Sequence, residues 1–162
     1  MLKFNSYSNV TEITIPSKVR VIDRSNMCSY MINPITTTLD SIHVTKMYQT
    51  YYYCRNLTTP VCGPNVTSMY LTYQNCTNLT TAVCGDKVID MSGTYSDCPN
   101  LTTAACGNNV INMYYTYRNC LNLTTAVCGD NVTNMFHAYE NCTNLTTAAC
   151  GNSITNMDNF YR

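Results

Sequence analysis

The chain has no tryptophan, little charge and no long apolar run. Nine Lys and Arg residues balance nine Asp and Glu residues, and charged side chains make up 11% of its 162 residues, against roughly 25% in an average soluble domain. Proteins that bind nucleic acid electrostatically need clustered Lys and Arg, so this composition argues against that class. No apolar stretch reaches the roughly 18 residues that a transmembrane helix needs, so we expect no membrane insertion.

Signals for export and for catalysis are also missing. The opening residues MLKFNSYSNVTEIT contain no apolar segment of the kind found in signal peptides, so no secretory leader is predicted. The sequence contains no G-x-S-x-G, H-E-x-x-H, P-loop or glycine-rich dinucleotide motif. We interpret His137 and Glu140 as a solvated pair on a variable face rather than as an acid–base couple. We therefore predict no catalytic residues and a protein that is not an enzyme.

What the sequence does contain is an internal repeat of 22 residues, the step from Cys54 to Cys76. The segment NCTNLTTAVCGDKVIDMSGTYSDC is followed by NLTTAACGNNVINMYYTYRNC and then by NLTTAVCGDNVTNMFHAYENC. We use "column" for the residues that occupy one position in successive units. Six columns keep the step: Cys54, Cys76, Cys98, Cys120 and Cys142; Cys62, Cys84, Cys106, Cys128 and Cys150; Leu57, Leu79, Leu101, Leu123 and Leu145; Val44, Val66, Val88, Val110, Val132 and Ile154; Met47, Met69, Met91, Met113, Met135 and Met157; and Tyr51, Tyr73, Tyr95, Tyr117, Tyr139 and Tyr161.

The repeat predicts a solenoid. One unit has too little apolar surface to offset the entropy of its chain, whereas stacked units bury the same residues against one another. The coils should stack at the strand spacing of about 4.8 Å. Alternation after Leu79 predicts a short strand with Ala82 and Cys84 inward and Thr81 and Val83 outward, and the Gly that follows ends it. The spacing of Val, Met and Tyr in each unit predicts a helical or 3₁₀ turn on the opposite wall.

The unit C-x-x-L-x-x-A-x-C-G-x-x-V-x-x-M-x-x-T-Y-x-x-C resembles the leucine-rich repeat of the BspA type, which reads C-x-x-L-x-x-I-x-I-P-x-x-V-x-x-I-G-x-x-A-F-x-x-C. The segment ITIPSKVRVI matches the family positions through Ile13, Ile15, Pro16, Val19 and Ile22. Elsewhere the chain departs from the family by one residue in length, by Ala and Cys for two strand Ile residues, and by Gly for Pro. The resemblance implies a leucine-rich-repeat-like solenoid with short parallel strands on one wall. It also implies surface recognition and adhesion.

We divide the chain into three parts. Residues 1–44 are interpreted as divergent N-terminal repeats that cap the solenoid, residues 45–156 as five 22-residue units, and residues 157–162 as a truncated C-terminal end. The strand edge of the last coil would then be open, and self-assembly at this edge is one hypothesis for a partner.

Cysteine is frequent, but its number and spacing argue against a disulfide framework and against metal sites. Eleven is an odd number, so the cysteines cannot all pair within the chain. No C-x-x-C pair occurs, and His43 and His137 are the only histidines, which excludes Cys₂His₂ sites along the stack. We expect free, buried thiols that act as small hydrophobic residues in a reducing setting, with no metal and no cofactor.

Asparagine forms a column of its own at a turn, where stacked amides are expected to hydrogen-bond to their neighbours. Its members are Asn56, Asn78, Asn100, Asn122 and Asn144. Ten N-x-[S/T] sequences occur along the chain, and we interpret them as part of the repeat rather than as glycosylation sites.

Two surfaces are candidates for binding. The candidate strand face comprises Thr59, Thr81, Thr103, Thr125 and Thr147. This face is either a solvated strand surface, a protein-contact surface, or an array that orders water as ice-binding solenoids do. The candidate binding surface after each Met of the repeat comprises Tyr48, Tyr70, Leu71, Tyr114, Tyr115, Phe136 and His137. Surfaces rich in Tyr are common in recognition, because Tyr brings contact area with little rotamer entropy.

The functional hypothesis is a non-catalytic structural or recognition repeat protein with protein partners. Because no export signal or anchor is visible, the first form of this hypothesis is a component of a larger assembly such as a phage virion, located in the virion or in an intracellular assembly. The alternative is a microbial cell-surface adhesin that binds a host protein or glycan and reaches the surface by a non-classical route. An ice-binding solenoid is a third alternative.

Overall fold

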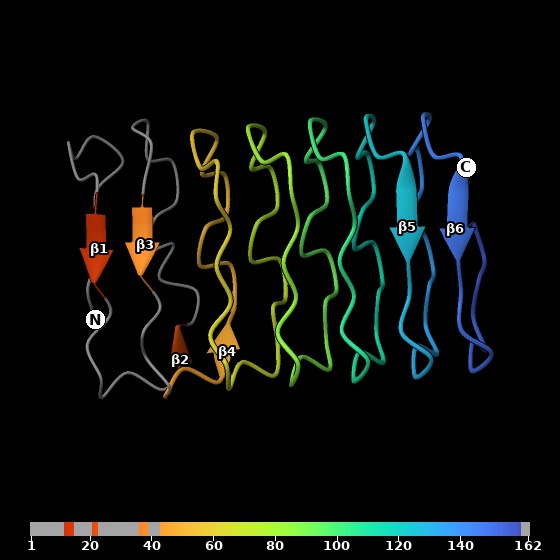
Figure 1. Ribbon diagram of the computed structural model, residues 1–162, viewed down its shortest axis with the longest axis horizontal. Helices are drawn as coiled ribbons and strands as arrows, with labels where there is room; N and C mark the ends of the chain where they lie inside the picture. The colour runs from red at the N-terminus through yellow and green to blue at the C-terminus, as the bar shows by residue number, and fades with distance from the viewer. Residues whose placement is uncertain (1–11, 15–20, 23–35, 39–42, 160–162) are drawn as a thin grey trace.

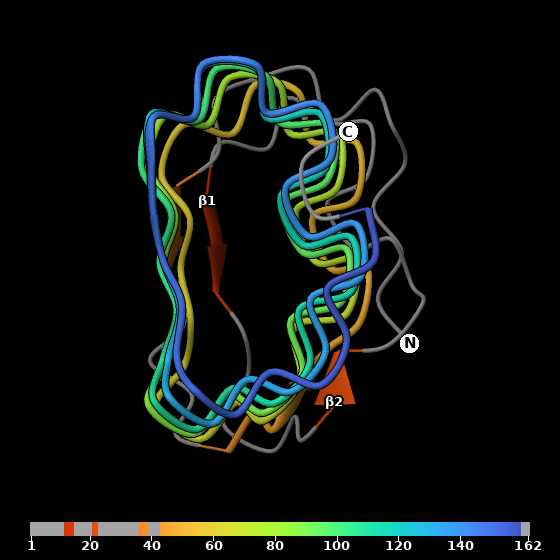
Figure 2. The same ribbon diagram turned by 90° about the vertical axis from the view of Figure 1, so that its right-hand side faces the viewer.

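The chain winds into a solenoid whose coils lie side by side along its long axis (Figure 1). This computed structural model describes all residues from 43 to 159 and, before them, the backbone of three short strands. In the view along the axis the coils superimpose as a flattened ring, with one nearly straight wall and one zigzag wall (Figure 2). The positions Ile15, Pro16 and Val19 of the family resemblance, and Tyr161 of the Tyr column, lie outside the described residues.

In the part of the chain that the structure describes, six short strands pair in parallel, each with a strand of a neighbouring coil. The pairs are β1 (Glu12–Thr14) with β3 (Thr36–Thr38), β2 (Val21–Ile22) with β4 (Lys46–Met47), and β5 (Thr125–Val127) with β6 (Thr147–Ala149). Isolated parallel bridges extend the pairing along both walls: Thr81 to Thr103 and Thr103 to Thr125 on the straight wall, and Lys46, Ser68, Asp90, Asn112, Asn134 and Asn156 in succession on the zigzag wall. The predicted stacking of parallel strands at a 22-residue step is confirmed.

The prediction of helical or 3₁₀ turns on the second wall is not confirmed, because across the described residues that wall contains bridges and isolated turns instead. The reason lies in the backbone hydrogen bonds. The N–H of Met47 donates to the carbonyl of Ser68 at 3.0 Å, and the N–H of Gln49 donates to that of Tyr70 at 3.0 Å. The same bonds recur from coil to coil, so groups that a helix would use internally join neighbouring coils.

The apolar columns form one continuous core between the two walls. The predicted inward columns are buried through the middle coils: Val44, Val66, Val88, Val110 and Val132; Met47, Met69, Met91, Met113 and Met135; Tyr51, Tyr73, Tyr95, Tyr117 and Tyr139; Cys54, Cys76, Cys98 and Cys120; and Leu57, Leu79, Leu101 and Leu123. Ala82 and Cys84 are half-buried and pack against this core, whereas Thr81 is exposed, as predicted. Val83, which was predicted to point outward with Thr81, is half-buried instead.

The buried tyrosines stack as a continuous column and connect the two walls. Their ring centroids are 5.2 to 5.5 Å apart, with interplanar angles of 3° to 11°. The Tyr95 hydroxyl donates to the carbonyl of Val83 at 2.7 Å and accepts from the N–H of Val83 at 2.9 Å. Tyr117 makes the same pair of bonds with Ala105, and Tyr73 with Val61. Each hydroxyl thereby satisfies backbone groups of the straight wall that face the core.

The buried thiols do more than fill space. The Cys98 thiol donates to the carbonyl of Tyr73 at 3.2 Å, and the Cys120 thiol donates to that of Tyr95 at 3.2 Å. The expectation that these cysteines act only as small hydrophobic residues therefore needs a correction, because they also satisfy carbonyl groups inside the core. Burial raises the pKa of Cys98 to about 12 and raises the pKa of the buried tyrosines well above 10.

Removal of one tyrosine hydroxyl should destabilise the solenoid. In Tyr95→Phe the N–H and the carbonyl of Val83 lose their partner inside the protein, so we expect the free energy of unfolding to fall by about 1–3 kcal/mol. Urea denaturation followed by circular dichroism measures the change. Tyr114→Phe, on the exposed zigzag wall, is the matched control and should change stability by less than about 0.5 kcal/mol. Equal effects of the two substitutions would contradict the role of the hydroxyl.

The fold should lose stability in alkaline solution. An unfolded thiol ionises near its usual pKa of 9.0, whereas Cys98 in the fold stays neutral up to about pH 12. The folded pKa is raised, so its contribution is complete below pH 9 and is lost as the pH rises towards 12, at about 1.4 kcal/mol per pH unit for each such thiol. Urea midpoints between pH 8 and pH 11 measure the decline. The Cys98→Ala variant should show a shallower slope, and parallel slopes would refute this account.

Candidate functional site

The variable residues after each buried Met gather on the zigzag wall and form two adjacent columns. The first, which we call the ring column, contains Tyr48, Tyr70, Ser92, Tyr114 and Phe136. The second, the corner column, contains Gln49, Leu71, Gly93, Tyr115 and His137. The structure thus places all seven residues of the predicted binding surface on one wall, in neighbouring coils.

Ring contacts connect successive coils within both columns. Tyr114 stacks on Phe136 with centroids 5.7 Å apart and an interplanar angle of 12°. Tyr115 stacks on His137 at 4.7 Å and 4°. Tyr48 meets Tyr70 edge-on at 6.2 Å. These rings are partly covered by one another and are not fully buried, since Tyr70 and Tyr114 retain exposed fractions of 42% and 40%.

The local backbone explains why two consecutive rings lie on the outside. Tyr115 has a φ of 54°, in the left-handed region, and the other corner-column residues share this conformation. Just before it, the Asn112 side chain accepts the N–H of Tyr114 at 3.1 Å. Asn134 and Asp90 cap the equivalent turns of their coils. The turn interrupts the alternation of a strand, and so Tyr114 and Tyr115 both face solvent with their rings 4.3 Å apart.

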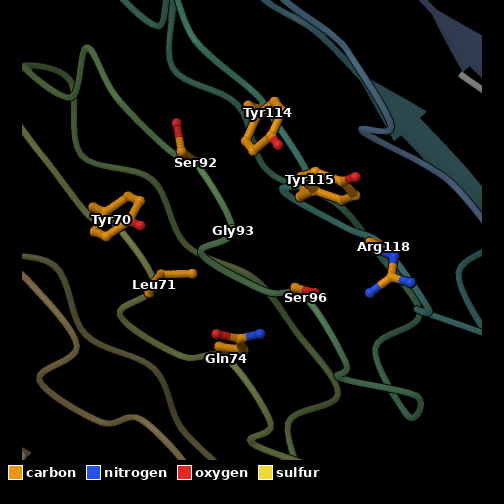
Figure 3. Close-up of a pocket in the computed structure, with 9 residues that line it drawn as sticks. All are labelled: Tyr70, Leu71, Gln74, Ser92, Gly93, Ser96, Tyr114, Tyr115 and Arg118. Atoms are coloured by element: carbon orange, nitrogen blue, oxygen red, sulfur yellow. The ribbon is translucent and has the colours of Figure 1, made fainter. Parts of the chain in front are cut away.

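A pocket of about 210 Å³ lies where the columns lack large side chains (Figure 3). Ser92 and Gly93 form its floor, with Ser96 beside them, because small residues stand here in place of rings. The other lining residues are Tyr70, Leu71 and Gln74 on one side and Tyr114, Tyr115 and Arg118 on the other. A Cβ atom at position 93 would lie 2.4 Å from Leu71 Cδ2, so any larger residue would have to displace that side chain.

An ionic group borders this pocket. Arg118 Nε donates to Glu140 Oε2 at 2.8 Å, and His137 Nδ1 lies 2.9 Å from the same oxygen. The interpretation of His137 and Glu140 as a solvated pair needs correction, because their side chains are only 16% and 19% exposed and Arg118 joins them. The Arg118 guanidinium also lies 5.4 Å from the Tyr115 ring centroid. Stacking and ion pairing therefore fix the rim of the pocket on this side.

Several lining residues were not predicted. Gln74, Ser96 and Arg118 each come directly after a buried tyrosine, in the same column as Glu140. A signal was present: Arg118 and Glu140 are opposite charges in one column, 22 positions apart. A second, shallower groove of about 510 Å³ was also missed. It is lined by Thr67, Lys87, Ile89, Asn109, Ile111, Asn131 and Thr133.

The candidate strand face lies on the straight wall, where Thr81, Thr103 and Thr125 form bridges, whereas the ring column follows the separate bridges of the zigzag wall. All five of its threonines are exposed. Their role in binding stays a prediction.

The asparagine column forms the expected amide bonds: Asn122 donates to Asn100 at 3.4 Å, and Asn144 donates to Asn122 at 3.5 Å.

The sulfur atoms form a column beside the straight wall. The Cys84 thiol donates to the Met91 sulfur at 3.5 Å, and the pattern recurs at Cys106 with Met113. All cysteines from 43 to 159 are free. In that same stretch there is no cluster of three His, Cys, Asp or Glu side chains that could bind a metal ion.

The geometry defines a class: a parallel β-solenoid with a constant core and a variable outer wall. The model of the BspA type leucine-rich repeat region, in six copies, matches residues 2–95 and 70–161. The chain belongs to the BspA-type leucine-rich repeat family. Repeats of this kind are generally non-catalytic and generally mediate protein interactions. No curated protein sequence matches the chain.

Solved structures support the fold. A leucine-rich repeat protein from T. pallidum has a TM-score of 0.74 at 14% identity, covering 88% of this chain and 70% of the other. One from Bacteroides ovatus has a TM-score of 0.75 at 19% identity, covering 90% and 38%. A leucine-rich cell surface protein from Faecalibacterium prausnitzii has a TM-score of 0.53 at 14% identity, covering 91% and 34%. The chain thus spans little more than a third of the last two proteins.

These comparisons do not support the virion hypothesis, whereas a cell-surface protein is among the similar structures. At these identities the similarity establishes the fold alone. Within the described part of the chain, no helix is both long and apolar enough to span a bilayer.

Thiol labelling should follow burial. Cys150 is exposed, whereas Cys120 is fully buried and burial raises its pKa well above the usual value. Since the thiolate is the reactive form, iodoacetamide at pH 8 should modify Cys150 first and should reach Cys120 only after denaturation. Peptide mass spectrometry over time measures both rates. Equal rates in the native protein would contradict the buried Cys column.

Proposed function

We propose that this chain is a recognition module of the cell-surface type that binds a partner through the zigzag wall. The observation that supports the proposal is a contrast between positions. The core columns repeat the same residue types in every coil, whereas the ring and corner columns vary and gather exposed rings on one wall. Aromatic residues together with Arg are the side chains that most often dominate binding energy at interfaces.

The zigzag wall is a better candidate than the straight wall. It offers a pocket, stacked rings and an Arg side chain fixed by Glu140. The straight wall offers a regular row of threonines, and Thr is also a common residue on a solvated strand. We therefore favour a surface adhesin over a virion component or an ice-binding solenoid. The proposed partner is a protein or a glycan outside the cell.

Truncation of the ring column should abolish recognition. The wild-type chain, presented on beads, is tested on arrays of extracellular-matrix proteins and glycans. A variant with Tyr48, Tyr70, Tyr114 and Phe136 changed to Ala should bind its target about tenfold more weakly or worse, because it lacks the exposed rings. Biolayer interferometry on the target found gives the dissociation constants.

The matched control changes Thr59, Thr81, Thr103 and Thr125 to Ala on the straight wall. This variant should bind as the wild type does, and both variants must keep the circular dichroism spectrum of the parent. If the threonine variant loses binding and the ring variant keeps it, the zigzag wall is not the binding surface. If the wild-type chain binds no target, the recognition function is wrong as stated.

A further inference from the structure

The coil that contains Gly93 differs from its neighbours at more than the two positions that open the pocket. In the column that caps each turn, the next three coils carry Asn, whereas this coil carries Asp90. At the second left-handed position of each coil, the coils on both sides carry Asn75 and Asn119, whereas this coil carries Asp97. The unit of Gly93 therefore has no ring in the ring and corner columns, and it has two carboxylates that its neighbouring units lack.

The loss of the rings uncovers aromatic faces. Phe136 covers one face of Tyr114, and His137 covers one face of Tyr115; both come from the following coil. The coil of Ser92 and Gly93 supplies no ring that could stack on Tyr114 from the other side, and both tyrosines line the pocket. The Tyr115 ring is already occupied, because the Arg118 guanidinium lies 5.4 Å from its centroid. Figure 3 shows Tyr70 on the other side of this gap. The faces of aromatic rings are electron-rich and attract cations.

The two carboxylates lie behind the floor of the pocket. Asp90 accepts from the hydroxyl of Ser92 at 2.5 Å and from its N–H at 3.0 Å. The other oxygen of Asp90 accepts from the hydroxyl of Ser68 at 3.3 Å. Asp97 accepts from the hydroxyl of Ser96 at 3.3 Å, and from the side-chain amides of Gln74 at 3.4 Å and Asn119 at 2.5 Å. Because the serine hydroxyls donate to these carboxylates, their lone pairs remain as acceptors for a ligand.

These two charges have no cationic partner within residues 43–159. In that range the ion pairs all involve Glu140, which takes the charge of Arg118 and contacts His137. The surroundings of the pocket therefore contain the three carboxylates of Asp90, Asp97 and Glu140 and the one guanidinium of Arg118, so negative charge is in excess there. The carboxylates would repel an anionic ligand. A neutral aromatic ligand would not compensate their negative charge.

We propose that this pocket binds an organic cation, an ammonium or guanidinium group, between the rings of Tyr70 and Tyr114 and above the serines that donate to the two aspartates. The proposal rests on the proposed recognition function and names the chemistry of the group that the zigzag wall selects. Such a group is found on Lys and Arg side chains of a protein partner and on choline headgroups.

The test compares cations with a neutral molecule of the same shape. Choline and 3,3-dimethylbutan-1-ol differ in charge but have nearly the same shape. Nα-acetyl-arginine amide and Nα-acetyl-lysine amide represent a protein partner. NMR titration of the full chain should shift the Tyr70, Tyr114 and Tyr115 signals with at least one cation, and the neutral alcohol should bind about threefold to thirtyfold more weakly. The cation that binds most tightly identifies its source.

The chain itself offers conservative variants. The double variant Asp90→Asn, Asp97→Asn carries the residues that neighbouring coils have at these positions, so it should fold normally while losing both charges. We expect its affinity for the cation to fall severalfold. Asp130→Asn with Asp158→Asn makes the same change in charge away from the pocket and is the matched control. Ser92→Tyr should fill the gap from within, as Tyr70 and Tyr114 do in their coils, and should abolish binding.

Two results would overturn the proposal: no saturable shift with any of the cations, or equal affinity for choline and its neutral analogue. Unchanged affinity in the double Asn variant, with its urea midpoint intact, would also overturn it. These outcomes are separable from a failure of the recognition function. A chain that binds no cation but whose ring variant still loses its array target would keep the recognition function and lose the cation site.

Discussion

The hydrogen bonds from the hydroxyls of Tyr73, Tyr95 and Tyr117 to the backbone of the straight wall are the constraint on which the other features depend. Tyr95 reaches Val83, and Tyr117 reaches Ala105, always across twelve positions of the chain. Each bond fixes the separation of the two walls and therefore the width of the core that Leu, Val and Met fill. A unit with one residue more or fewer between the partners would misplace the hydroxyl, which gives a physical reason why this spacing of twelve positions is the same in these units.

Much of the fold could be predicted because every member of a column has the same surroundings. Burial of Met69 implies burial of Met91, and exposure of Thr81 implies exposure of Thr103. The backbone of the zigzag wall was harder to predict from the sequence. Apolar residues three and four positions apart are typical of a helical turn and also of a turn with one left-handed residue. Leu71 adopts that conformation without any glycine to indicate it, so periodicity could not distinguish the two structures.

The candidate site was predicted in part for a similar reason. Variation between units identified the exposed rings, which is a property of single columns. The pocket depends on contacts between columns: the left-handed corner that turns Tyr115 outward, and the ion pair that holds Arg118 over it. Sequence patterns within one unit do not contain these relations, since Arg118 and Glu140 belong to different coils. A comparison of each column for residues that depart from its consensus would have identified Gly93 and Asp97 together.

The pocket is built by three consecutive coils, those of Leu71, Gly93 and Tyr115, whose left-handed corners and coil-to-coil bridges recur along residues 43–159. In a stacked array each unit contacts only its neighbours, so the same three units could form this pocket at another position along the array. Duplication of the middle unit would produce a wider gap, and recombination between units would move the gap along the array without any change to the core. Ligand diversity in a protein of this construction can thus arise from the order of its units, with a core that tolerates the rearrangement because every junction is the same.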